Sequence, residues 1–447
     1  MMRDRTIRLG AGAGFAGDRI EPAVELVEQG ALDYLVFECL AERTIAAAQQ
    51  ARQRDPEQGF DPLLLERMRR VLPAARSCGV RIITNAGAAN PIGAAHAVAR
   101  LAREMGLAPL RIAAVTGDDV LTAIEETPLP LIDRPGTTAD IRGKVSANAY
   151  LGAAPIAQAL DQGADIVLTG RVGDPALFVG PMVHEFGWSL DDAVLMGRGT
   201  VVGHLLECAG QLTGGYFADM SRKRVPGLAR LGFPFADVAP NGDAVLGKVA
   251  GSGGELSLAT CKEQLLYEIL DPGAYQQADV VADLRGVRFE ELGKDRIAVT
   301  GGGGSPRTGT LKVSIGYDDG FIGEGQISYA GPGAVERGRL AIAIVRERLK
   351  LLGVRLQEVR CDLIGVDAVD RSAAGDSGSA REVRVRIAGR ADHHAAAATV
   401  GAEVEALYTN GPFGGGGVTR HVRPVLAIAS TLLPATAVTP SIHLVEA

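Results

Sequence analysis

Two side chains in the run VVGHLLECAG have the types and the spacing that acid–base chemistry needs. His204 and Glu207 lie three positions apart, so a helix would place them on one face. A histidine beside a carboxylate can transfer protons. With Cys208 the pair could instead bind a metal, but the spacing is not the HExxH of zinc enzymes. The bland alternative is a buried polar cluster in an apolar helix, which would need internal partners.

A second group lies in FECLAERT, directly after an apolar run. Glu38 is a candidate general base and Cys39 a candidate nucleophile. Arg43 is placed to hold a substrate carboxylate. The alternatives are that Cys39 packs as a small apolar side chain and that Arg43 pairs with Glu38.

The run GAGAGFAGDR carries the spacing of a phosphate-binding turn. Gly12, Gly14 and Gly17 form GxGxxG between an expected strand and an expected helix, and Glu38 follows Gly17 by 21 residues. This context predicts phosphate binding, and a nicotinamide dinucleotide is one form of it. Asp18 argues against a dinucleotide because its charge would repel the pyrophosphate. The structural alternative is a tight turn before a capped helix.

Three further loops present polar side chains after short apolar runs. Asn85 in TNAGAANP is a candidate ligand contact, and Asp118 in TGDDV is a candidate acid, base or cation ligand. Arg171 and Asp174 in TGRVGDP suit the binding of a carboxylate or phosphate. The alternatives are a helix cap for Asp118 and a mutual ion pair for Arg171 and Asp174.

Two glycine-rich runs outside these loops could also hold anions. Lys262 follows GSGG at an expected helix start, and Arg420 follows GGGG in NGPFGGGGVTR. A linker role is at least as good an interpretation of either run.

The elements that must position these residues alternate along the first half of the chain. Apolar strands are expected at 34–37, 80–84, 111–115 and 165–168, with helices between them. This alternation predicts an α/β fold with a mostly parallel, Rossmann-like sheet and helices on both faces. The candidate loops then meet at the carboxyl ends of the strands, where such sheets bind ligands. A (β/α) barrel is the alternative and would gather the same loops.

The chain is long enough for two domains. The pattern changes near residue 279, where strands precede a helix, so we expect a glycine-rich α/β domain at 1–278 and a C-terminal α+β domain at 279–447. The second domain has the order of a split βαβ unit.

Composition excludes several classes of protein. The 58 glycines among 447 residues are about twice the usual share of ~7 %, which favours close approach of backbone to a small ligand. The net charge of −7 without a basic stripe argues against nucleic-acid binding. No apolar run is long enough to span a membrane, and the N-terminus does not read as a signal peptide. The five cysteines are widely spaced, so we expect a cytoplasmic protein without a disulfide framework.

The chain also resembles a known family over nearly its whole length. The runs GAGAGFAGDR, DYLVFECLAERTIA, RIITNAGAANP, VVGHLLECAGQLTGGYFAD and GFIGEGQISYAGPG are similar to those of the acyclic terpene utilisation family AtuA. The resemblance implies catabolism of branched or terpenoid acids through acyl-CoA intermediates. Longer relatives carry a ferredoxin-like module marked by a run similar to ARSGDKG. This sequence lacks that run, so we expect the main domain alone, with a separate small ferredoxin-like subunit as a candidate partner.

The leading hypothesis is an enzyme that adds or removes water or a proton on an acyl-CoA or a small carboxylic acid. The alternatives are an NAD(P)-dependent oxidoreductase and a non-catalytic subunit that needs a partner chain. The cofactor stays open between coenzyme A as part of the substrate, a nicotinamide coenzyme and a divalent metal. No metal ligands are assigned, and a homo-oligomer is expected because most soluble oligomers are homo-oligomers.

Overall fold

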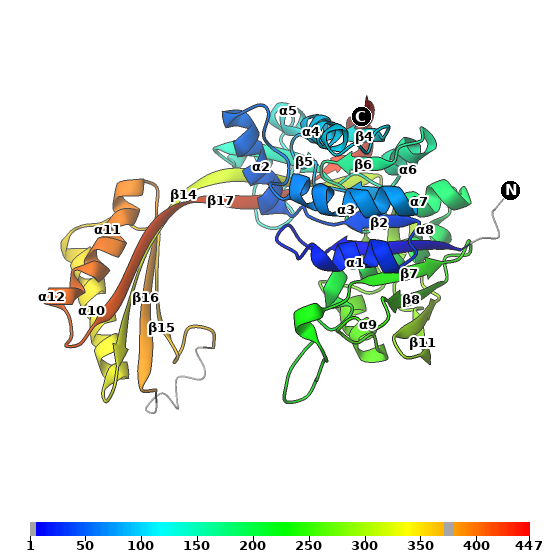
Figure 1. Cartoon of the computed structure of the whole chain (residues 1–447). Coiled ribbons are helices and arrows are strands. Elements are labelled where there is room, and N and C mark those ends of the chain that lie inside the picture. Colours follow the sequence, from blue (N-terminus) through cyan, green and yellow to red (C-terminus); the bar gives the residue numbers. More distant parts are fainter. Residues whose placement is uncertain (1–5, 371–379) are drawn as a thin grey trace. The chain divides into compact units, whose positions relative to one another are not determined.

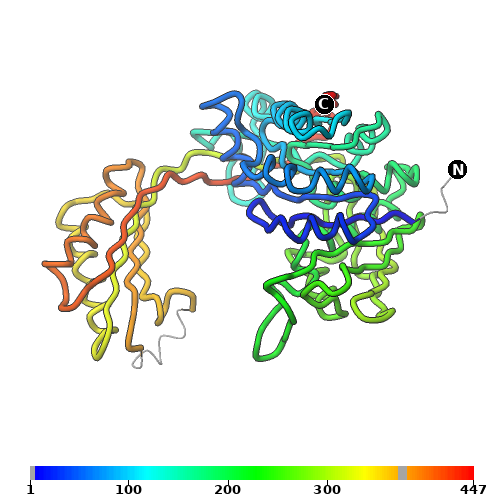
Figure 2. Tube along the Cα trace, viewed as in Figure 1, coloured from blue at the N-terminus to red at the C-terminus, as the bar shows by residue number. Residues whose placement is uncertain are grey.

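The computed structural model describes residues 6–370 and 380–447. The chain divides into two compact units (Figure 1). The larger unit comprises the residues up to Gly316 together with Ile428–Ala447, and the smaller comprises Tyr317–Ala427. The chain passes between the units twice (Figure 2), inside the long strands β14 (Thr310–Ala330) and β17 (Gly416–Pro434).

The centre of the larger unit is a set of five parallel strands. Their order is β1 (Ile7–Ala13), β2 (Tyr34–Phe37), β3 (Arg81–Thr84), β6 (Ile166–Thr169) and β4 (Arg111–Thr116). These strands are almost continuously buried, which explains why their sequences are apolar runs instead of alternating patterns. The α/β expectation is therefore confirmed for this part of the chain.

The expectation of a mostly parallel sheet is wrong for the sheet as a whole. Beyond β1 it continues antiparallel through β7 (Pro234–Val238), β8 (Ala244–Lys248), β12 (Arg296–Thr300) and β11 (Arg288–Gly293). At the other edge β18 (Ser441–Glu446) pairs antiparallel with β4. The result is an open, ten-stranded mixed sheet.

Two rows of helices cover the central strands. One row contains α1 (Glu21–Gln29), α3 (Leu64–Cys78) and α4 (Pro91–Glu104), which contact one another in that order (Figure 1). The other row contains α6 (Ala154–Asp161), α7 (Ala176–Phe186) and α8 (Ala193–Glu207). Because α4 and α6 both contact β4 and β6, the two rows lie on opposite faces of the sheet.

Helix α8 is buried along most of its length. It is largely apolar, and a second small sheet of β9 (Tyr275–Gln276), β10 (Val280–Asp283) and β13 (Gly303–Pro306) packs on it. A Cβ atom at Gly197 would lie 2.0 Å from the carbonyl oxygen of Gly303, so glycine is needed for this contact. The buried helix carries His204 and Glu207 at its end.

The remaining elements of the larger unit lie around this framework. They are α2 (Glu42–Arg54), α5 (Leu121–Glu126), β5 (Lys144–Ala149) and α9 (Leu258–Leu266). None of the helices in the described ranges combines the length and the apolar character needed to cross a bilayer.

The boundary expected between residues 278 and 279 falls inside the larger unit. Strands β10 to β13 follow that point, and β12 pairs with β8 while its Ile297 and Val299 are buried in the same core. The alternating pattern of these strands differs from the apolar runs of the parallel strands and therefore suggests a separate domain. Antiparallel strands at the edge of one sheet also alternate, because one of their faces is exposed.

The smaller unit has an antiparallel sheet with helices packed on it. Its sheet order is β15 (Glu358–Ile364), β16 (Glu382–Ala391), β14 and β17. The helices α10 (Ala334–Leu351), α11 (His394–Glu405) and α12 (Leu407–Asn410) complete a β-α-β-β-α-β order. It has its own core, which includes Ile327, Val345, Ile387 and Val400.

Candidate active site

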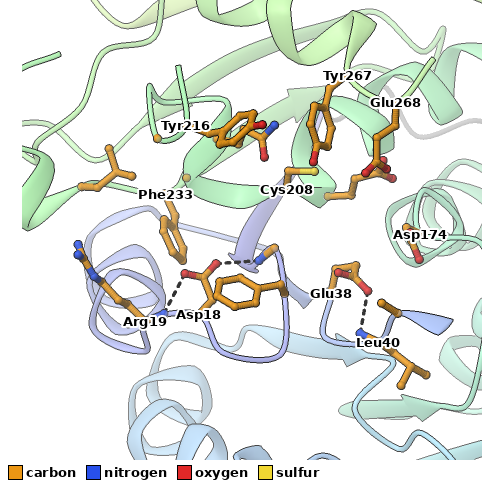
Figure 3. Close-up of a pocket in the computed structure, with 18 of the residues that line it drawn as sticks. Asp18, Arg19, Glu38, Leu40, Asp174, Cys208, Tyr216, Phe233, Tyr267 and Glu268 are labelled. Atoms are coloured by element: carbon orange, nitrogen blue, oxygen red, sulfur yellow. Dashed lines mark hydrogen bonds between the residues drawn. The ribbon is translucent and has the colours of Figure 1, made fainter. Parts of the chain in front are cut away.

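A cavity of about 730 Å³ lies at the carboxyl ends of the parallel strands. The loops after β1, β2 and β6, the end of α8 and the segments 210–233 and 267–268 supply its walls, as Figure 3 shows. Six carboxyl side chains line it: Asp18, Glu38, Glu42, Asp174, Glu207 and Glu268.

In the loop after β1, the Asp18 carboxylate accepts hydrogen bonds from the backbone of the same loop. Asp18 accepts hydrogen bonds from the backbone N–H groups of Gly14, at 2.9 Å, and of Arg19, at 2.9 Å (Figure 3). Burial raises the pKa of Asp18. A Cβ atom at Gly14 would lie 2.5 Å from the backbone carbonyl carbon of Cys208, so glycine lets the end of α8 approach this loop.

Glu38 is held at the tip of β2 with one oxygen fixed. Its Oε1 accepts from the backbone N–H of Leu40 at 2.8 Å (Figure 3). The same oxygen accepts from Nδ2 of Asn85 at 2.9 Å. Burial and the nearby Asp174 carboxylate raise the pKa of Glu38 to about 8, although Arg171 opposes the shift. An ordinary glutamate has a pKa of ~4.3, so this carboxyl group keeps its proton at neutral pH.

Glu207 and His204 form a buried pair at the end of α8. His204 Nδ1 lies 2.8 Å from Glu207 Oε1, and His204 Nε2 lies 3.2 Å from the carbonyl oxygen of Leu265. Because a carbonyl only accepts, Nε2 carries a proton, and the pair shares a second proton between Nδ1 and Oε1. Glu207 Oε2 is buried and has no hydrogen-bond partner among the described residues.

The environment of Glu207 brings the pKa of its carboxyl group close to neutrality. Burial raises the pKa of Glu207 to about 7; His204 opposes this shift, and the carboxylates of Asp174 and Glu268 add to it. Burial disfavours the imidazolium form of His204, but the Glu207 carboxylate outweighs that and raises the pKa of His204.

Arg171 connects the cavity to a smaller one of about 250 Å³. The two cavities share Glu42, Arg171, Asp174 and Glu268. Arg171 Nη1 donates to the carbonyl oxygen of Leu40 and to Asp174 Oδ1, the latter at 2.7 Å. The guanidinium carbon also lies 4.0 Å above the ring of Tyr150. The ion pair expected as the alternative for Arg171 and Asp174 is therefore present.

Next to the Tyr150 hydroxyl, Glu42 is held as a carboxylate. The Tyr150 hydroxyl donates to Glu42 Oε1, which also accepts from Lys312 Nζ at 3.2 Å. Burial alone would raise the pKa of Glu42, but the hydrogen bond from Tyr150 and the charges of Arg171 and Lys312 lower it to about 2. The site thus combines one permanently charged carboxylate with two carboxyl groups that titrate near neutral pH.

Comparison with known proteins gives the family. A family model described as acyclic terpene utilisation family protein AtuA matches residues 7–444. The chain belongs to the AtuA family. No curated protein and no solved structure matches the chain. Membership associates this AtuA chain with the use of acyclic terpenes and does not define a reaction.

In this AtuA chain two of the expected catalytic side chains, Glu38 and Glu207, line the same cavity. His204 lies behind Glu207 and is 1 % exposed.

Cys39 is buried outside the cavity lining, and burial raises the pKa of its thiol, which favours the packing interpretation. Asp118 is also buried; it accepts from Asn148 Nδ2 and from the backbone N–H of Arg171, and so fixes the tip of β6.

Only some of the residues expected to bind substrate or phosphate lie at the cavity. Gly14, Arg171 and Asp174 line the cavity, and Asn85 orients Glu38 from behind. The other expected binding residues, Gly12, Gly17, Arg43, Lys262 and Arg420, are not part of its lining. Gly12 packs against the Phe37 ring, Gly17 and Arg43 are exposed, and Lys262 lines a neighbouring cavity. Arg420 belongs to the smaller unit, where it pairs with Glu405 at 3.3 Å.

Sequence reasoning missed Glu42, Tyr150, Glu268 and Lys312. The sequence does indicate Glu42 as a site residue, because it follows Glu38 by one helical turn in the same motif. Tyr150 and Lys312 are brought together by the pairing of β5 with β14, which no local pattern indicates. Across the described ranges, no group of three or more His, Cys, Asp or Glu side chains is arranged to hold a metal ion.

Proposed function

We propose that the chain is an enzyme of acyl-CoA or carboxylic-acid catabolism, of the branched or terpenoid type, that adds water to or removes it from its substrate. One observation carries the proposal: Glu38 and Glu207 line one cavity with pKa values of about 8 and about 7. Both carboxyl groups can therefore exchange a proton near neutral pH, and the charge of His204 favours the ionised form of Glu207, so we assign Glu207 as the base and Glu38 as the acid. A base and an acid poised near the working pH are what general acid–base catalysis requires.

The roles follow from the hydrogen bonds of each oxygen. His204 holds Glu207 Oε1, so Oε2 is the atom left to take a proton from water. As that water's oxygen bonds to C3 of an α,β-unsaturated acid derivative, the double-bond electrons move to C2. Glu38 then gives its proton to C2, and the reverse sequence eliminates water. His204 is a positioning residue in this scheme because it acts through Glu207.

The competing nicotinamide chemistry has less support. In a dinucleotide site the amides of the glycine-rich turn bind the pyrophosphate. Here the Gly14 N–H already donates to the Asp18 carboxylate, whose charge would repel a phosphate at that position.

The test is turnover of the purified full-length chain on branched α,β-unsaturated acids and their thioesters. Glu207→Gln and Glu38→Gln should each lower kcat by about 10²–10⁴-fold while the protein stays folded. Glu126→Gln, an exposed change on α5, is the matched control and should retain full activity. Unchanged turnover in both cavity variants would contradict the assignment of Glu207 and Glu38 as the catalytic base and acid. No turnover by the wild type on any substrate would favour the non-catalytic subunit that requires a partner chain.

A further inference from the structure

A third cavity, of about 880 Å³, adjoins the candidate active site and has a different charge. It shares Tyr267 and Glu268 with the active-site cavity. Its lining carries four cationic side chains, Arg222, Lys223, Arg224 and Lys262. We call it the basic cavity.

Three of the four cations in the basic cavity are free to meet a ligand. Lys223 pairs with Glu263 and lies 4.4 Å from the centre of the Phe217 ring. Arg222, Arg224 and Lys262 have no side-chain hydrogen bond or ion pair within the described part of the chain. Glu255 and Glu268 are the other carboxyl groups in the lining. Arginine side chains without a carboxylate partner bind phosphate oxygens in a forked geometry.

The active-site cavity offers the opposite environment. Six carboxyl side chains line it, and its two arginines are already engaged. Arg171 pairs with Asp174, and Arg19 donates to the carbonyl oxygen of Leu228 at 3.2 Å. A polyanionic group would be repelled there. A substrate that used both cavities would therefore place an uncharged reactive end among the carboxyl groups and its anionic end among the arginines.

An aromatic pair stands at the border between the cavities. The rings of Tyr216 and Tyr267 lie 6.0 Å apart in an edge-to-face arrangement. Tyr216 is 84 % exposed, which is unusual for a tyrosine at a cavity wall and leaves a ring face open to a planar group. Base–aromatic stacking is a common means of holding nucleotides, and it contributes about 1–3 kcal/mol per base in single-strand binding.

We propose that the basic cavity binds the phosphate groups of a nucleotide-bearing carrier, and that the acyl arm of that carrier reaches Glu38 and Glu207. The inference rests on the proposed function for the acyl arm alone. It assigns Arg222, Arg224 and Lys262 to the phosphates and Tyr216 to the base.

The experiment is titration calorimetry of the full-length chain with three probes: coenzyme A, ADP and inorganic pyrophosphate. We expect coenzyme A and ADP to bind and pyrophosphate to bind at least tenfold more weakly. The variant R222A/R224A/K262A should lose at least tenfold in affinity for coenzyme A, and Lys262→Ala alone should lose part of it. The variant R76A/R100A/R142A removes the same charge from exposed sites outside both cavities and should bind as the wild type does.

The outcomes separate this inference from the proposed function. The inference is overturned if no probe binds the wild type, if the triple variant binds coenzyme A unchanged, or if pyrophosphate binds as tightly as coenzyme A. Turnover should also be measured on a thioester that lacks phosphates. If that thioester is hydrated and Glu207→Gln abolishes the reaction while coenzyme A does not bind, the basic cavity assignment fails and the function stands. If coenzyme A binds through the three cations but nothing is turned over, the assignment of the basic cavity stands and the proposed function fails.

Discussion

Two oxygen atoms, Oε2 of Glu207 and Oε2 of Glu38, carry the proposed proton transfers, so pH is the most direct probe of single residues. Activity should rise with pH as Glu207 ionises near a pKa of about 7 and fall as Glu38 ionises near about 8. The imidazolium of His204 lowers the pKa of Glu207. His204→Asn should therefore move the acidic limb of the kcat/KM profile to higher pH and leave the alkaline limb in place. An acidic limb that does not move would remove His204 from its positioning role.

The buried carboxyl group of Glu38 should also reduce stability as the pH rises. The pKa of Glu38 is about 8 in the folded chain against 4.5 for an unperturbed glutamate, so the folded state holds a proton that the unfolded state has lost. Stability then falls as pH increases from about 4.5 to about 8. Glu38→Gln keeps the oxygen that accepts from Leu40 and Asn85 and removes the titration. We expect similar melting temperatures for the two proteins at pH 5 and a higher one for the variant at pH 8. A variant that melts below the wild type at pH 8 would contradict this.

At the scale of elements, the end of α8 reaches the loop after β1 only because residue 14 is glycine. In Gly14→Ala the new Cβ would lie 2.5 Å from the Cys208 backbone, which is adjacent to Glu207. Backbone must shift, so we expect a loss of about 1–3 kcal/mol in the free energy of unfolding, together with a large loss of activity. Gly303→Ala is the control, because nothing lies within 4 Å of its new Cβ. Denaturant unfolding and turnover measure both effects, and a Gly14→Ala protein with wild-type activity would show that α8 can move without harm.

The elements also show what the sequence could predict. Residues 34–37 were placed correctly because four apolar residues between polar neighbours form a buried strand with clear ends. Helix α7 was missed because it contains Gly180 and Pro181, two residues that usually end helices. The hairpin of β7 and β8 has no clear strand signal in the sequence, because its strands are short and contain proline and glycine.

The sequence could predict those residues of the candidate site that directly follow a recognisable strand or helix. Glu38 and Glu207 each follow a recognisable element, and parallel strands bring such loops to one edge. Tyr150 and Lys312 lie 162 positions apart in the chain, and only the pairing of β5 with β14 makes them neighbours of Glu42. The pKa values depend on burial and on Asp174 as a common neighbour, and residue spacing contains neither quantity.

For the whole molecule, two units with separate cores predict two unfolding transitions. Every residue that lines the active-site cavity belongs to the larger unit. Ile387 is fully buried in the core of the smaller unit, so Ile387→Ala should destabilise that unit by about 2–5 kcal/mol. Leu205→Ala, a buried change in α8, should lower the other transition. In calorimetry each variant should move one transition, and Ile387→Ala should keep its turnover at temperatures below the lower transition. If both variants shift a single shared transition, the units unfold together, and the smaller one contributes to the stability of the site in spite of its separate core.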